Sequence, residues 1–278
     1  MALKTKITTT KKLEYAERTK DFKEKIKELE NQLNAILKDI SKGGELVNYK
    51  KIAAANLYLN LIALNIKLSD ISLEVLGIKN EAYLENARKL YYKLLAILEE
   101  IVGTHIDAPL TENKEALETI SKLDDLKRLK LIKNISEALT NIEERFGPDS
   151  KWKWSFVDLE ARAAVLCKNL IDFKLIQEKN DPRIEGYPER NETMRFIKSY
   201  LRRAADRVRE KYEIATHDFG EMKKAIQILE VLARISTVFS TTQEEIDNLR
   251  KTIKTWQEKL EQDEKLEEER KKEKLKKK

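Results

Sequence analysis

The sequence has few residues that interrupt a helix. Its 278 residues include only seven glycines and four prolines, which stand at or near breaks between long segments of mixed charged and apolar residues. Gly ends helices because it tolerates left-handed backbone angles, and Pro cannot continue a helix. The pattern therefore predicts an all-α, elongated protein of about eight long helices in two coiled-coil-like helical bundles.

Residues that carry chemistry are also scarce. The single cysteine, Cys167, excludes an internal disulfide and a cysteine-based zinc site, and its apolar neighbours predict a buried side chain rather than a reactive thiol. The two histidines, His105 and His217, have no Glu three residues before them, as di-iron bundles require. No Gly-rich phosphate loop is present. We expect no catalytic residue, no metal and no cofactor, and hence a protein that is not an enzyme.

Charge and hydropathy suggest where the protein works. Basic side chains number 55 and acidic ones 49, a net charge of +6, so nucleic acid is a conceivable partner that charge alone does not favour. The N-terminus leads into Thr and Lys rather than an apolar run, so we expect no secretory leader. The most apolar stretch, 52–66, contains three asparagines and is too short to span a bilayer. We expect a soluble, cytoplasmic protein without a transmembrane segment.

The chain divides near its midpoint. Gly147-Pro148 predicts a boundary between an N-terminal helical bundle at 1–147 and a C-terminal one at 151–260, followed by a charged tail at 261–278 that is a solvated or frayed helix. Helices are expected at about 8–41, 45–76, 79–103, 113–146, 155–179 and 190–217, then from Asp218 and from 242. The first and last carry coiled-coil-type seams, Phe22, Ile26, Leu29, Leu33, Ile36 and Ile40 in one, and Ile246, Leu249, Ile253, Trp256 and Leu260 in the other.

The helix predicted at 45–76 has two apolar stripes. One stripe consists of Leu57, Leu61, Leu64, Leu68, Ile71 and Val75, and the other of Ile52, Ala55, Leu59, Ile62 and Ile66. Leu57 and Leu59 are two residues apart, which corresponds to about 200° around a helix, so the two stripes face nearly opposite sides. A helix that is apolar on both sides must be covered on both sides. Either its neighbours in the chain or a partner subunit provides that cover.

A basic stripe is the strongest polar pattern. On the helix predicted at 190–217, cations spaced three, four and seven residues apart fall on one face: Arg195, Lys198, Arg202 and Arg209. They either lie along the bundle edge and pair with Asp206, Glu210 or a neighbouring helix, or form a surface that binds an anionic partner. Aromatic residues that would favour single-stranded nucleic acid are sparse on this segment.

Two further features could anchor a partner. Trp152 and Trp154 follow the predicted boundary and either pack between the helical groups or project as anchors. The connection at 178–189 either spans a bundle end or presents Arg183 and Tyr187 at an exposed recognition tip.

Together these patterns predict a non-enzymatic structural or adaptor protein whose long helices serve protein–protein assembly. A protein partner or self-association is expected. The alternative is a binding module for an anionic surface, nucleic acid or acidic membrane, that uses the basic stripe and the lysine-rich C-terminus.

Overall fold

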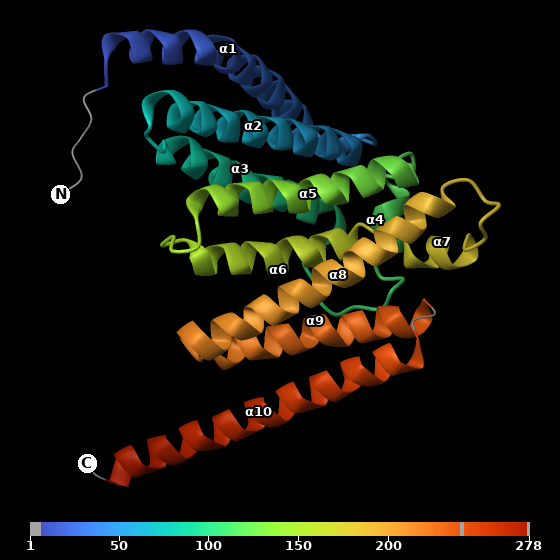
Figure 1. The fold of residues 1–278 in the computed structure, drawn as a ribbon. Helices are drawn as coiled ribbons and strands as arrows, with labels where there is room; N and C mark the ends of the chain where they lie inside the picture. Colours follow the sequence, from blue (N-terminus) through green and yellow to red (C-terminus); the bar gives the residue numbers. More distant parts are fainter. Residues whose placement is uncertain (1–6, 240–241, 277–278) are drawn as a thin grey trace. The chain divides into compact units, whose positions relative to one another are not determined.

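The computed structural model describes residues 7–239 and 242–276. Within these ranges the chain forms ten α-helices, a π-helical turn and no β-strand (Figure 1). The prediction of an all-α protein with about eight long helices is confirmed. The helices are α1 Thr9–Ile40, α2 Val47–Leu76, α3 Glu81–Val102, α4 Lys114–Glu118, α5 Asp125–Phe146, α6 Lys153–Asn169, α7 Phe173–Glu178, α8 Tyr187–Lys211, α9 Phe219–Val238 and α10 Gln243–Lys276, with the π turn η1 at Tyr212–Thr216.

The helices form two compact units. Unit 1 comprises the chain up to Gly103 together with Glu115–Phe156, and unit 2 comprises Thr104–Lys114 together with the chain from Val157 onward. The sequence placed the second group from residue 151, whereas the contacts assign Trp152 and Trp154 to unit 1. They also assign Thr104–Lys114, which the sequence placed among the N-terminal helices, to unit 2.

Two predicted helices are interrupted. The segment predicted as one helix at 113–146 is split into α4 and α5, and the segment at 155–179 is split into α6 and α7. An aspartate begins the second helix in each case: Asp124 accepts a hydrogen bond from the Lys127 amide at 2.8 Å, and Asp172 from the Leu175 amide at 2.9 Å. Asp favours N-caps because its carboxylate binds the unpaired amides of the first turn. The predictions of unbroken helices here were wrong.

The helix predicted to end at 217 changes its geometry before it ends. Regular α8 stops at Lys211, and η1 follows. His217 closes η1 in the left-handed conformation, with φ 49°, and its amide donates to the Tyr212 carbonyl at 2.9 Å. A non-glycine residue in this conformation is uncommon, so the turn is a locally strained feature.

Helix α2 is the core helix of unit 1. It packs against α1, α3 and α5, and Figure 1 shows it between α1 and α3. Both of its stripes are buried, with Leu61 and Ile62 each 1% exposed. Asn65, also buried, donates to the Leu61 carbonyl at 2.8 Å and accepts from Asn86 at 3.0 Å, which satisfies its amide. The chain's own helices therefore cover the two stripes, as the first of the two alternatives predicted.

Helix α2 also has the length and composition of a membrane span, unlike any other described helix. Its mean hydropathy reaches 1.3 over an 18-residue window, of which 61% is buried inside the structure. The stretch 52–66 is too short to span a bilayer, but the whole of α2 is long enough. A core helix passes the same test, and packing against three neighbours explains the apolar residues of α2.

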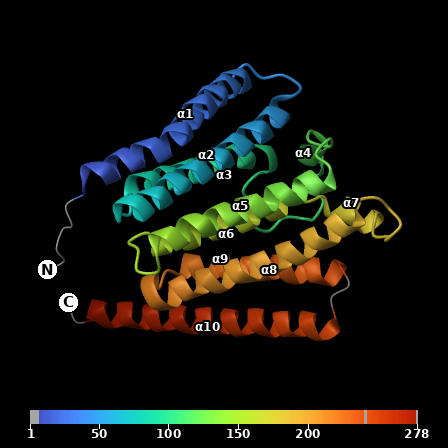
Figure 2. The same cartoon turned by 45° about the horizontal axis from the view of Figure 1, so that its top comes forward.

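In unit 2, α9 lies between α8 and α10 (Figures 1 and 2). Buried charges join α8 to its neighbours. Glu160 of α6, 2% exposed, forms ion pairs with Arg203 and Arg207 of α8. Lys211 at the end of α8 binds Asp158 at 2.6 Å and Glu221 at 2.8 Å. Pairing offsets the desolvation of these groups, so removal of one partner would leave an uncompensated charge.

A segment between α3 and α4, Thr104–Lys114, is held against unit 2 and is called the strap below. Lys168 is 5% exposed and its Nζ donates to the Ile106 carbonyl at 2.8 Å. Arg234 pairs with Asp107 at 2.6 Å. Burial lowers the pKa of Lys168 to about 8, because desolvation disfavours its charged form; Asp107 opposes this shift and Arg234 adds to it.

Leu61→Asp should unfold unit 1, because an unpaired carboxylate in this position costs several kcal/mol. Urea unfolding followed by circular dichroism would measure the loss. Ala53→Asp, at an exposed position of the same helix, is the matched control and should change little. Equal stability of Leu61→Asp and the control would contradict the burial of this stripe.

Lys168 should make unit 2 more stable as the pH rises from 7 to 9.5. In this window the unfolded chain, with an ordinary lysine pKa, binds more protons than the folded chain, whose Lys168 has a pKa of about 8. The difference in unfolding free energy between wild type and Lys168→Met should grow by about 2 kcal/mol in favour of the wild type. Urea titrations followed by Trp256 fluorescence, in a chain with Trp152 and Trp154 replaced by Phe, would measure it. A constant difference would refute the lowered pKa.

Candidate interaction surfaces

The predicted basic stripe lies along α8 in unit 2. Three of its four members, Arg195, Lys198 and Arg202, line a groove of about 640 Å³ beside the first turns of α10. Glu244 and Glu245 of α10 line the same groove. Arg209 lies apart from it, with its guanidinium 5.0 Å from the Trp256 ring centre.

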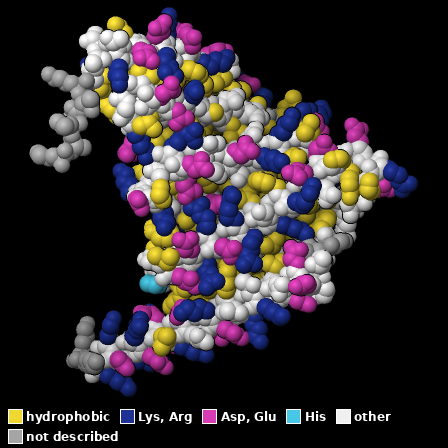
Figure 3. All heavy atoms as spheres, viewed as in Figure 1, with side chains coloured by type: hydrophobic (Ala, Val, Ile, Leu, Met, Phe, Trp, Pro, Cys, Tyr) yellow, Lys and Arg dark blue, Asp and Glu magenta, His cyan; other side chains and the backbone are white. Residues whose placement is uncertain are grey.

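Each arginine of the stripe has an acidic partner nearby on the chain. Arg195 pairs with Glu192 at 3.2 Å, Arg202 with Asp206 at 2.9 Å and Arg209 with Glu213 at 2.8 Å. Burial lowers the pKa of Lys198, and Glu245 opposes the shift. Exposed pairs of this kind contribute about 0 to 1 kcal/mol each, but they reduce the net field of the stripe. Figure 3 shows basic and acidic side chains intermixed over the face in view.

The tryptophans just after α5 belong to unit 1, and both are half-buried. The guanidinium of Arg88, on α3, lies 3.7 Å from the Trp152 ring centre, and Lys151 approaches the same ring. Lys153 lies 4.7 Å from the centre of the Trp154 ring. Cations over these rings contribute to packing. Trp152 thus packs within unit 1 through α3.

The connection at 178–189 is fixed from inside. Arg190, which the sequence analysis did not single out, is 4% exposed and donates to the carbonyls of Lys179 at 3.1 Å and Glu185 at 2.9 Å. Arg183 is 89% exposed and binds Asp181 at 2.6 Å. Tyr187 is the first residue of α8. The connection therefore has an ordered base at Arg190 and projects Arg183 outward.

A groove between α2 and α5 is a further surface that the sequence analysis missed. It holds about 380 Å³ and is lined by Leu59, Asn60, Ile62, Ala63, Ile66, Lys67 and Asp70 of α2 and by Asn134, Glu137, Ala138, Asn141 and Arg145 of α5. The lining of α2 contains a polar row with the same spacing of three and four residues as the apolar stripes. That spacing was the signal available in the sequence.

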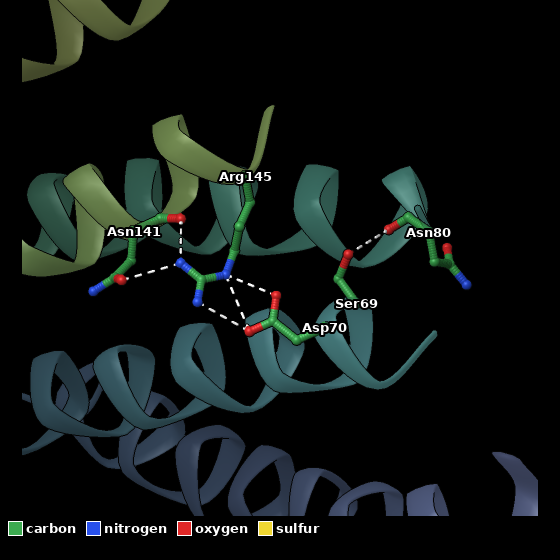
Figure 4. A network of polar contacts seen from close by, with 5 residues as sticks. All are labelled: Ser69, Asp70, Asn80, Asn141 and Arg145. Atoms are coloured by element: carbon green, nitrogen blue, oxygen red, sulfur yellow. Dashed lines mark hydrogen bonds and ion pairs between the residues drawn. The ribbon is translucent and has the colours of Figure 1, made fainter. Parts of the chain in front are cut away.

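An ion pair closes one end of the α2–α5 groove (Figure 4). Arg145 Nε donates to both carboxylate oxygens of Asp70, at 2.8 and 3.1 Å, and Arg145 Nη2 donates to Oδ2 at 2.9 Å. Arg145 Nη1 also donates to the Asn141 carbonyl and amide oxygens, both at 3.1 Å. A bidentate pair fixes orientation as well as distance, so it sets the alignment of α2 with α5.

A third groove lies beside η1. It holds about 780 Å³ and has η1, the start of α9 and the second half of α10 as its walls. Tyr212 donates to Asp263 at 2.6 Å, and Lys259 pairs with the same carboxylate at 2.8 Å. Burial raises the pKa of Tyr212, as does its hydrogen bond to Asp263. The exposed His217 lines the groove.

The described residues contain no cluster of three or more His, Cys, Asp or Glu side chains suited to a metal ion. Cys167 is buried, and burial raises the pKa of its thiol. His105 faces Asn113 in the strap, with 3.1 Å between Nε2 and the amide oxygen. His105 thus lies in the strap, Cys167 in α6 and His217 at the end of η1.

Comparison with known proteins gives a family and little more. No curated protein matches the chain. A solved structure described as "Computational Design of Self-Assembling Cyclic Protein Homooligomers" is 16% identical over 90% of this chain and 99% of its own, with a TM-score of 0.29. Another, described as "DHF58 filament", is 17% identical over 91% and 98%, with a TM-score of 0.28. These scores are too low to carry an argument. The TP0443 family model, in contrast, matches residues 11–264, and the chain therefore belongs to the TP0443 family.

Proposed function

We propose that this protein is a non-enzymatic adaptor whose long helices serve protein–protein assembly. The observation that supports this most directly is α10, a helix of 34 residues with only four buried side chains, the last of them Leu260. The helix continues to Lys276 with side chains that are exposed or half-buried. We call residues 261–276 the α10 arm.

The α10 arm gains little from packing within its own unit. Its main attachments are Asp263, through Tyr212, and Glu264, which pairs with Lys223 at 2.8 Å. Beyond these, Leu266 is 51% exposed and Leu275 is 74% exposed. A largely polar helix that extends beyond its core is suited to contact another molecule, because its backbone is already ordered and its side chains are accessible.

Helix α1 has a similar character at the other end of the chain. Of its 32 residues only Thr19, Leu29 and Leu33 are buried. Phe22 and Ile26 of the predicted seam are half-buried against the α2 side. Each unit therefore has one long helix, α1 or α10, with few buried side chains. These two helices favour a role in protein–protein assembly over the binding of a ligand in a single pocket.

A second candidate function is binding to an anionic surface. The groove beside α10 that contains Arg195, Lys198 and Arg202 favours it, since three cations converge there with the hydroxyls of Ser199 and Thr242. The acidic partners of the arginines weaken this candidate. Its signature would be affinity that falls steeply with salt.

The α10 arm should crosslink to a specific protein. A photoreactive benzoyl-phenylalanine at Leu275 should give discrete protein adducts in cells that make the protein naturally, because this side chain is exposed on the arm. The same group at Leu46, exposed at 56% in unit 1, is the matched control. Deletion of residues 265–278 should abolish the interaction while the thermal unfolding midpoint stays within a few degrees. Identical adduct patterns at Leu275 and Leu46 would count against the proposal.

The basic stripe can be tested separately. Replacement of Arg195, Lys198 and Arg202 by Ser should leave the fold intact and, if the adaptor function holds, leave the Leu275 adducts unchanged. Binding to duplex DNA, RNA and vesicles of anionic lipid at low and high salt would be measured in parallel. Salt-sensitive binding that the triple variant loses would instead establish the anionic-surface function.

A further inference from the structure

The α2–α5 groove has a regular construction. On α2 the residues Asn60, Ala63, Lys67 and Asp70 are spaced three, four and three apart, and on α5 the residues Asn134, Ala138, Asn141 and Arg145 are spaced four, three and four apart. Such spacing places each row on one face of its helix. Both rows line the same groove.

The two rows run in the same direction and are aligned with each other. Asp70 and Arg145, separated by 75 residues, are joined by the bidentate ion pair, and the other members of the rows differ by nearly the same separation. The groove therefore has successive layers: an Asn–Asn layer, an Ala–Ala layer, a Lys–Asn layer and the Asp–Arg layer that closes it.

The middle of the groove has room for a side chain from outside. Ala63 is exposed and Ala138 half-buried, and between the helices lie buried Ile62 and Ile66. Small residues at one layer allow a third helix to approach closely and insert a larger apolar side chain. On the surfaces of helical proteins a polar-edged apolar groove of this kind takes an amphipathic helix.

Several polar side chains on the rims of the groove make no ion pair or hydrogen bond with other described residues. Within the described residues neither Lys67 nor Glu137 forms an ion pair, although Lys67 acts at longer range on Glu74. The amides of Asn60 and Asn134 form no hydrogen bond within the same part of the chain. The cation Lys67, one layer from the alanines, calls for an acidic residue on the occupant, and the anion Glu137 on the other rim calls for a basic one.

We infer that the α2–α5 groove binds an amphipathic α-helix of a partner protein, with a large apolar residue at the Ala63–Ala138 layer and an acidic residue beside Lys67. The asparagine layer fixes the register of that helix, as a buried Asn does in coiled coils. This site lies in unit 1 and goes beyond the proposed use of the α10 arm, which belongs to unit 2.

A designed peptide tests the groove directly. The probe is a fluorescently labelled helix of about three heptads with a leucine seam and a Glu at the seam position next to the central leucine; a second probe has Lys there. Fluorescence anisotropy with the full-length chain should show about tenfold tighter binding of the Glu peptide, a difference typical of one charge reversal. Lys67→Glu should invert the preference.

Two alanine variants distinguish specific binding in the groove from non-specific binding of the peptide. Ala63→Trp fills the groove and should abolish binding of both peptides, whereas Ala53→Trp, exposed on the same helix outside the groove, should leave it unchanged. Circular dichroism and thermal unfolding confirm that both variants fold. No binding up to about 1 mM, equal binding of the two peptides, or indifference to Ala63→Trp would overturn the inference.

The outcome is distinguishable from that of the proposed function. Leu275 adducts that persist in Ala63→Trp, with no peptide binding to the wild type, would refute the groove and retain the assembly role of α10. Peptide binding to the wild type without specific Leu275 adducts would support the groove and refute the assembly role of α10. A dimer in light scattering that Ala63→Trp dissociates would overturn the assignment to a separate partner, because a second copy would then occupy the groove.

Discussion

Unit 1 depends on the burial of α2 from more than one side. Because two apolar stripes occupy opposite sides of this helix, α1 covers one side and α3 and α5 pack against others. One gap between the stripes holds the row from Asn60 to Asp70, which lines the groove, and the other holds the buried polar residues Asn65, Ser69 and Ser72. The α2–α5 groove is therefore a direct result of how the core is built, since the same helix provides both the core and one rim.

Charge is managed differently at the surface and in the interior. On the exposed face of α8, the arginines of the basic stripe pair with acidic residues three or four positions away along the chain, which reduces the local positive field. In the interior of unit 2, Glu160 and Lys211 each have two partners from other helices. The surface pairs tolerate change, whereas the interior ones determine which helices can lie together.

The sequence predicted what local pattern controls. Seam spacing identified the long helices, and Gly77, Gly103 and Gly147 end α2, α3 and α5 as expected. Asp124 and Asp172 were missed because the surrounding segments remain helix-like in composition, and a single capping residue decided the break. The groove and the buried role of Arg190 were beyond reach for another reason. The groove requires knowing that α2 and α5, distant in the sequence, lie side by side. The role of Arg190 requires the path of the loop before it, whose carbonyls it binds. Apolar periodicity along one helix contains neither piece of information.

The strap has a consequence for the order in which the chain becomes structured during synthesis. Thr104–Lys114 emerges from the ribosome well before Lys168 and Arg234, the residues that hold it in unit 2. Unit 1 needs the chain on both sides of the strap, since it continues from Glu115 to Phe156. Unit 1 can therefore fold before the strap, which interrupts its sequence, has Lys168 and Arg234 to bind. The strap must stay accessible until α9, which carries Arg234, has been synthesised.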